Sequence, residues 1–256
     1  MLTPQIRSQL IRERMETRYP GQTDFSHDDP IPGSPMGHAA GYRIASDIVR
    51  HYRRTHRPES MFITPDELIE TIVAAGVDRW VLMGLYGYVG YLPQPRATQD
   101  VDVLIDNEQI DAALAAVLKR WPRLVPDSGP IVIRLRDPGE IGVDGEVKVV
   151  IDLMRPTDSL YEAILSQHHI TDSDTGHRLP IIEAALAAKY SAIVSPYRLF
   201  ERKLQDAVDF RSIAKGNRTR IDHDIAHQLA ELIYPGGGQE ILEFINLAQT
   251  DQPFPV

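Results

Sequence analysis

Two apolar segments of the chain are interrupted by aspartate, and this feature constrains the fold most. QDVDVLID places Asp100 and Asp102 among valine, leucine and isoleucine, and VKVVIDLM places Asp152 in a similar run. An ionised carboxylate in apolar surroundings is costly unless it is paired or binds a cation. Strand side chains alternate between faces, so Asp100 and Asp102 are expected on one face, roughly 6.5 Å apart. If the two strands lie side by side, the three acids meet, and a divalent cation would relieve their repulsion.

The composition is that of an ordinary globular protein, with 43% hydrophobic and 25% charged residues. No apolar run approaches the roughly 18 residues needed to cross a membrane, and the N-terminus has no apolar signal core. The absence of cysteine excludes disulfides and thiolate zinc sites and is typical of a reducing compartment. The net charge of −9 argues against a broadly basic surface that coats nucleic acid. We therefore expect a cytoplasmic protein with no membrane partner.

The order of patterns predicts strands first and helices afterwards. Thr64, Pro65 and Glu67 form a capping-box start for a helix that ends at Gly76, and Asp106 is expected to cap the helix in NEQIDAALAAVLKRW. Strands are predicted in VDRWVLMG, QDVDVLID, IVIRLR and GEVKVVIDLM, and helices from Thr157 almost to the end. Residues 1–38 are predicted to be an arm with little structure, 39–156 an α/β core with leading helices, and 157–256 a helical domain.

A helix from about Gly41 to Arg57 has two distinct sides. Its apolar side consists of Ile44, Ile48, Val49 and Tyr52, and its basic side consists of Arg50, Arg53, Arg54 and Arg57. The basic side is interpreted as a solvated helix face, with an RNA or phosphorylated partner as the alternative.

The segment VLMGLYGYVGYL predicts a strand that ends at Gly84 and turns directly into a short helix. The free N–H groups and the positive dipole end of such a helix favour an anion near the aspartates. Gly84 is assigned to phosphate binding, and Gly87 and Gly90 to close packing. The segment lacks the G-x-G pair of a dinucleotide-binding loop.

From Val77 to Ile213 the chain resembles the nucleotidyltransferase superfamily with the polymerase-beta-like fold, and within it the AbiEii-like abortive-infection toxins. Arg96, Thr98, Asp100 and Asp102 occupy that group's R-x-T-x-D-x-D, and Asp152 its third acid. RLPIIEAALAAKYSAI resembles the group's basic helix through Lys189, and RKLQDAVDF its K-x-x-D-x-x-D through Lys203, Asp206 and Asp209. The resemblance implies an α+β fold in which a small mixed-sheet nucleotidyltransferase core is followed by a helical domain.

The resemblance also implies the chemistry. Asp100, Asp102 and Asp152 would hold Mg²⁺ or Mn²⁺, with Asp152 helping to deprotonate the acceptor hydroxyl. Gly84, Leu85, Arg96, Thr98 and Lys189 would contact the NTP, with pyrophosphate as the leaving group. Leu85 departs from the usual Gly-Gly or Gly-Ser, which leaves a degenerate nucleotide-binding module as an alternative. Asp206 and Asp209 are expected either to pair with Lys203 or Arg202 or to orient Lys189.

Several acceptors and partners remain open. The acceptor could be tRNA or another RNA, as in a toxin paired with an antitoxin, or a small molecule, as in antibiotic-modifying enzymes. His223 and His227 have helical zinc-ligand spacing but no third ligand, and YPGGGQE lacks the G-K-[ST] of a phosphate loop, so it is interpreted as a loop between helices.

Overall fold

The computed structural model describes Ile6, Gln9, Glu13, and residues 35–250 and 252–255. The predicted arm, residues 1–38, lies largely outside the described residues. Contacts divide the chain into two units, residues 1–33 and 34–256, and all that follows concerns the second unit. No helix in the described residues is long and apolar enough to cross a membrane.

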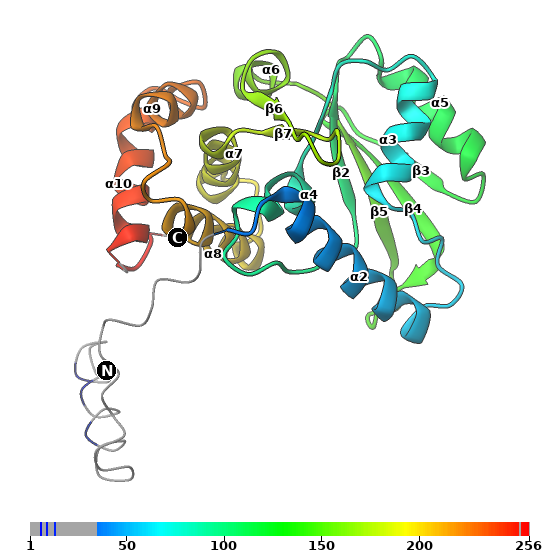
Figure 1. The fold of residues 1–256 in the computed structure, drawn as a ribbon, viewed down its shortest axis with the longest axis horizontal. Coiled ribbons are helices and arrows are strands. Elements are labelled where there is room, and N and C mark those ends of the chain that lie inside the picture. Colours follow the sequence, from blue (N-terminus) through cyan, green and yellow to red (C-terminus); the bar gives the residue numbers. More distant parts are fainter. Residues whose placement is uncertain (1–5, 7–8, 10–12, 14–34, 251, 256) are drawn as a thin grey trace. The chain divides into compact units, whose positions relative to one another are not determined.

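Strands and helices alternate in the first part of this unit, and helices dominate the last part (Figure 1). In chain order the elements are α2 (His38–His56), α3 (Pro65–Ala74), β1 (Trp80–Leu82), α4 (Gly84–Tyr88), the 3-10 helix η1 (Val89–Tyr91), β2 (Val101–Ile105), α5 (Ile110–Arg120), β3 (Val125–Ser128), β4 (Val132–Ile141), β5 (Val147–Met154), α6 (Ser159–Ser166), β6 (His169–Thr171), β7 (Arg178–Pro180), α7 (Ile182–Val194), α8 (Phe200–Gly216), α9 (His223–Glu231) and α10 (Gly237–Gln249). The predicted α+β fold, a small mixed sheet followed by helices, is confirmed. The short strands β3, β6 and β7 were not predicted.

The main sheet has the strand order β1-β2-β5-β4-β3. Only β2 and β5 run parallel, and the other neighbouring strands are antiparallel. Alternation along β2 divides the side chains between two faces. Val101, Val103 and Ile105 pack into an apolar cluster with α3 and α5, whereas Leu104 packs into a second cluster with α6, α7 and α8. Asp102 shares the face of Leu104, so it points toward the helical half of the protein.

Local sequence signals explain some helix ends and fail at others. The Thr64 capping box is present, with the Thr64 side chain accepting from the Glu67 N–H. Asp106 does not cap α5: the helix begins after Gln109, and Asp106 instead pairs with Arg79 and accepts a hydrogen bond from the Glu108 N–H. This prediction is wrong because residues 107–109 form a turn before the helix begins.

Helix α2 buries a different side from the one predicted. Tyr42, Ala45 and Val49 face the protein, whereas Ile44 and Ile48 are 39% and 45% exposed. Arg53, predicted on the solvated side, is only 4% exposed and pairs with Glu140. The error is one of helical phase: Arg53 lies four residues after Val49 and therefore on the same buried stripe.

Candidate active site

Asp102 and Asp152 are direct neighbours across the parallel strand pair β2 and β5 of the main sheet. The register of β2 and β5 places their Cα atoms opposite each other. Residues in register share a sheet face, so both carboxylates project from the same side. The acids that were expected to meet therefore do so at Asp102 and Asp152. Asp100 departs from its predicted strand position, because β2 begins at Val101.

Asp152 lies beside an irregularity in its strand. The register with β4 passes from Leu135 opposite Ile151 to Arg136 opposite Val149, which leaves Val150 as an extra residue. Such bulges bend a strand and redirect nearby side chains, and they are common beside active sites. The Asp152 Oδ1 atom is buried without a hydrogen-bond partner. Burial, followed by repulsion from Asp100, raises the pKa of Asp152 to about 6.

The three aspartates influence one another. Burial raises the pKa of Asp102 well above its ordinary value, and the charges of Asp100 and Asp152 raise it further. The positive charges of Lys189 and Arg198 act in the opposite direction and lower it. Asp102 and Asp152, whose proton affinities are raised by burial and by neighbouring negative charge, form a site at which a cation would bind favourably.

Gly84 is required at the turn beside Asp102. Its φ of +56° lies in the left-handed region, and a Cβ at this position would overlap the Asp102 carboxylate. The Met83 N–H donates to the Asp102 carbonyl at 2.8 Å, which joins this turn to β2. Gly87 and Gly90 serve close packing, since a Cβ on either would overlap the backbone of Leu82 or His38.

Leu85 does not crowd the opening of this turn. Its side chain is 3% exposed and packs in the apolar cluster with α6 and α7. The backbone N–H groups at the start of α4 have no partner four residues earlier within the helix, as at any helix start. The Leu85 side chain therefore leaves these backbone donors accessible beside Asp102.

Lys189, on α7, is held by two buried carboxylates of α8. Its Nζ atom lies 2.9 Å from Asp206 and 2.8 Å from Asp209. It also lies 4.8 Å from the centre of the Tyr88 ring. Burial works to lower the pKa of Lys189, but Tyr88 and the two aspartates raise it above its ordinary value. Of the two alternatives for Asp206 and Asp209, the structure therefore shows contact with Lys189.

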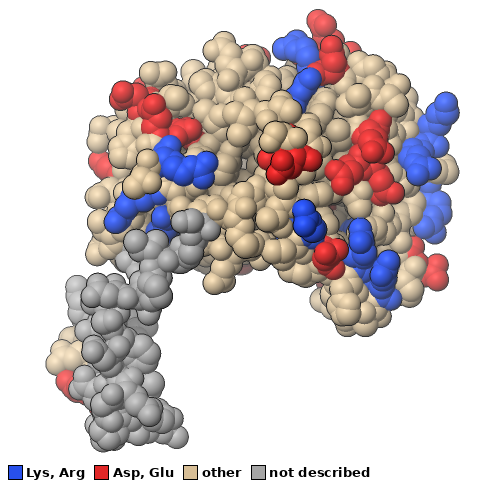
Figure 2. All heavy atoms as spheres, viewed as in Figure 1, with Lys and Arg blue, Asp and Glu red and all other residues tan. Residues whose placement is uncertain are grey.

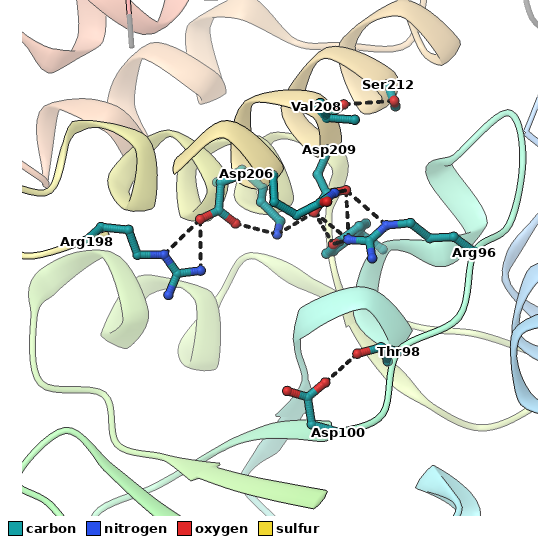
Figure 3. Close-up of polar contacts among 11 residues, drawn as sticks. Arg96, Thr98, Asp100, Arg198, Asp206, Val208, Asp209 and Ser212 are labelled. Carbon is teal, nitrogen blue, oxygen red and sulfur yellow. Dashed lines mark hydrogen bonds and ion pairs between the residues drawn. The ribbon is translucent and has the colours of Figure 1, made fainter. Parts of the chain in front are cut away.

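Two arginines extend this ionic network at either end. Arg96 donates to both carboxylate oxygens of Asp209, at 2.8 and 2.7 Å, and Arg198 donates to Asp206 at 3.0 Å (Figure 3). Asp206 and Asp209 are thereby neutralised, although both are almost fully buried. Thr98 donates to Asp100, so the two polar residues of the R-x-T-x-D-x-D segment bind different acids.

The network and the aspartate group interact across the site. Lys189 lowers the pKa of Asp102, and both residues also act on Tyr161 of α6, whose pKa burial raises to about 12. Arg198 and Tyr161 were not found from the sequence. No motif marks Arg198, and the helical pattern of SLYEAILS identifies Tyr161 only as a core residue.

On the other side of Asp152 the sheet carries basic residues. Arg134 of β4 is in register with Asp152, and Arg134 and Arg136 both lower the pKa of the Asp152 carboxyl. Arg134 is exposed, and on its other side it is in register with Asp127 of β3. The site thus has cations on two sides: Lys189 toward the helices and Arg134 toward the sheet edge.

A divalent metal is implied by the chemistry of these donors. Among the residues that the structure describes, no group of three or more His, Cys, Asp or Glu side chains is arranged to hold a metal ion, and His223 and His227 have no such third partner. Mg²⁺, however, is usually held by one or two carboxylates together with substrate phosphates and water. Asp102 and Asp152 in register, with one unpartnered Asp152 oxygen, fit that arrangement.

Comparisons with known proteins add little to this geometry. No protein-family model and no curated protein matches the chain. Similar solved structures include the crystal structure of an antigenic nucleotidyltransferase-like protein from Paracoccidioides brasiliensis. The two chains are 16% identical, the similarity covers 83% of this chain and 95% of that chain, and the TM-score is 0.38. A likeness of this size supports no assignment of residues or activity.

Proposed function

We propose that the protein transfers a nucleoside monophosphate from an NTP to an acceptor hydroxyl and releases pyrophosphate. The observation that carries the proposal is the pair Asp102 and Asp152, in register on parallel strands with raised proton affinities and opposed by Lys189. If these two positions served only to fill the core, apolar side chains would stabilise the fold better than two carboxylates that repel each other.

The roles of the residues follow from their positions. Asp102 and Asp152, with Asp100 as a third acid beside them, would hold Mg²⁺ or Mn²⁺ together with the phosphates, and the ion would neutralise their developing charge. The backbone at Gly84 and Leu85 approaches the phosphates, since no side chain fits between Gly84 and Asp102. Arg96 and Thr98 act indirectly, by orienting Asp209 and Asp100.

Asp152 and Lys189 serve opposite ends of the reaction. With a pKa of about 6, the Asp152 carboxylate is suited to accept a proton from the attacking hydroxyl near neutral pH. Lys189, fixed by two ion pairs, offers a point charge to the leaving pyrophosphate, whose negative charge grows in the transition state.

Arg134 favours an acceptor that carries negative charge. It lies opposite Asp152 on the neighbouring strand, and Asp152 is the group that would accept the proton of the attacking hydroxyl. A phosphate of RNA, including tRNA, would be attracted to the Arg134 guanidinium. Acidic and basic side chains are interspersed on the face drawn in Figure 2, so this face offers no broad basic surface.

The test is incubation of the protein with each α-labelled NTP, Mg²⁺ and total RNA. We expect label transfer to RNA together with pyrophosphate release, and neither in the Asp102→Asn variant. Arg134→Gln should reduce transfer to RNA more than it reduces NTP binding. NTP binding without release of pyrophosphate from the NTP, whichever acceptor is added, would identify the alternative, a non-catalytic nucleotide-binding module.

A further inference from the structure

The position of Asp100 is not determined by the sheet. Residues 95–98 have no regular secondary structure, Gln99 lies in a bend, and β2 begins only at Val101. Arg96 joins this segment to Asp209, and two further side chains hold the residues next to Asp100. The Thr98 hydroxyl donates to the Asp100 carboxylate, and the Arg53 guanidinium donates to the Gln99 carbonyl at 2.6 Å. Arg53 thus contacts the backbone directly before the first acid of the site, although it lies far away in the sequence.

Arg53 is buried in a manner that stability alone does not explain. It is 4% exposed, and its Nε atom donates to Glu140 at 3.0 Å, a residue that is itself 1% exposed. The second oxygen of Glu140 has no hydrogen-bond partner. Two apolar side chains of similar volume would usually be as stable as a buried ion pair. What they could not do is donate to the Gln99 carbonyl.

Helix α2 carries Arg53 to this place because it packs unusually close to the site. A Cβ on Gly41 would lie 3.0 Å from the Val89 carbonyl, and Gly90 approaches the His38 backbone too closely for any side chain. These contacts join α2 to η1, which continues directly from α4 and the turn at Gly84. The same helix therefore packs against η1 near its start and holds the segment before Asp100 near its end.

We propose that Arg53 is a positioning residue of the site, which holds Asp100 in place for cation binding through the Gln99 carbonyl while Glu140 orients its guanidinium. This inference rests on the proposed function in so far as Asp100 binds a metal. The planar guanidinium contacts Glu140 and Gln99 simultaneously through different nitrogens, a geometry that a lysine ammonium does not reproduce.

The experiment separates positioning from stability by removing the buried pair together. Arg53→Met alone leaves the Glu140 charge buried and should destabilise the protein. The double variant Arg53→Met/Glu140→Met removes both charges and should recover the melting temperature, but not the hydrogen bond to Gln99. Arg54→Met, at the exposed neighbouring position, is the matched control.

Two readouts are compared, amide hydrogen exchange of residues 97–101 in metal-free protein and Mn²⁺ affinity measured by EPR. We expect the double variant to exchange these amides about tenfold faster and to bind Mn²⁺ roughly 10- to 100-fold more weakly, whereas Arg54→Met resembles the wild type. Recovery of both properties together with the melting temperature would show that Arg53 is only structural and would overturn the proposal.

A further variant keeps the test decisive if the double variant does not fold. Arg53→Lys preserves the charge balance of the pair and should show the same faster exchange; unchanged exchange in it would also overturn the proposal. If wild-type protein binds no Mn²⁺, the proposed function fails, while the exchange comparison still decides whether Arg53 holds the segment before Asp100.

Discussion

Replacement of Asp152 by asparagine should stabilise the protein at neutral pH while abolishing transfer. Burial and repulsion from Asp100 raise the pKa of Asp152 in the folded state to about 6, from an ordinary 3.8. The folded protein therefore binds this proton more tightly than the unfolded chain does. Below about pH 3.8 the carboxyl is protonated in both states and costs nothing. As the pH rises from about 4 to 6, ionisation of Asp152 progressively destabilises the fold, and above pH 6 the cost is complete.

The magnitude follows from the size of the shift. A difference of about two pKa units corresponds to about 3 kcal/mol of unfolding free energy, which is an upper value because Asp152 is partly exposed. Asparagine also changes packing and hydrogen bonding, including the contacts of the buried oxygen, but these effects do not depend on pH. The gain in stability from Asp152→Asn should therefore be roughly 2 kcal/mol larger at pH 8 than at pH 4.

Urea unfolding followed by circular dichroism at both pH values measures this difference. Asp127→Asn is the control, because Asp127 is an exposed acid in the same row of the sheet and should change stability by no more than about 0.5 kcal/mol. An equal effect of Asp152→Asn at pH 4 and pH 8, or a loss of stability that is greater at pH 8, would refute the assignment of Asp152 as a strained carboxylate.

Three other variants test the site and its surroundings. Gly84→Ala should abolish the thermal stabilisation by NTP and should lower the unfolding free energy by more than the about 1–2 kcal/mol expected for an alanine in the left-handed region. Gly76→Ala is the control, because Gly76 also has a positive φ but has open space around it, and it should lose only about 1–2 kcal/mol in urea unfolding. Lys189→Arg should retain part of the turnover. Lys189→Met should lose the turnover together with roughly 3–5 kcal/mol of unfolding free energy, because two buried carboxylates lose their cation. Equal kcat values for the two variants would contradict this role of Lys189. Burial and then His177 lower the pKa of His38 to about 4, so stability falls as pH drops from 6.5 toward 4, and His38→Phe should flatten that part of the urea-derived pH profile.

The grouping of the acids could be predicted from sequence only in part. Side chains alternate along a strand, so Asp100 and Asp102 are expected on one face, and an aspartate in an apolar strand needs a compensating partner. The sequence predicts a meeting with Asp152 only on the condition that the two strands lie side by side. Their register confirms that they are neighbours. The turn at Gly84 was also evident, since a glycine between a strand and a helix indicates a close approach of the backbone.

The remainder depended on contacts between residues that are distant in sequence. The sequence pattern places Arg53 on the solvated side of its helix. This is wrong because a helix with apolar residues on two sides can bury either side, and packing against η1 decides which side is buried. The partners of Asp206 could have been any nearby cation on the same helix, and tertiary structure instead brought Lys189 and Arg198 to it. The sequence determines which residues are charged, but the tertiary structure determines which of them form pairs. Several cations could pair with the same carboxylate equally well, and the fold decides which of them lies beside it.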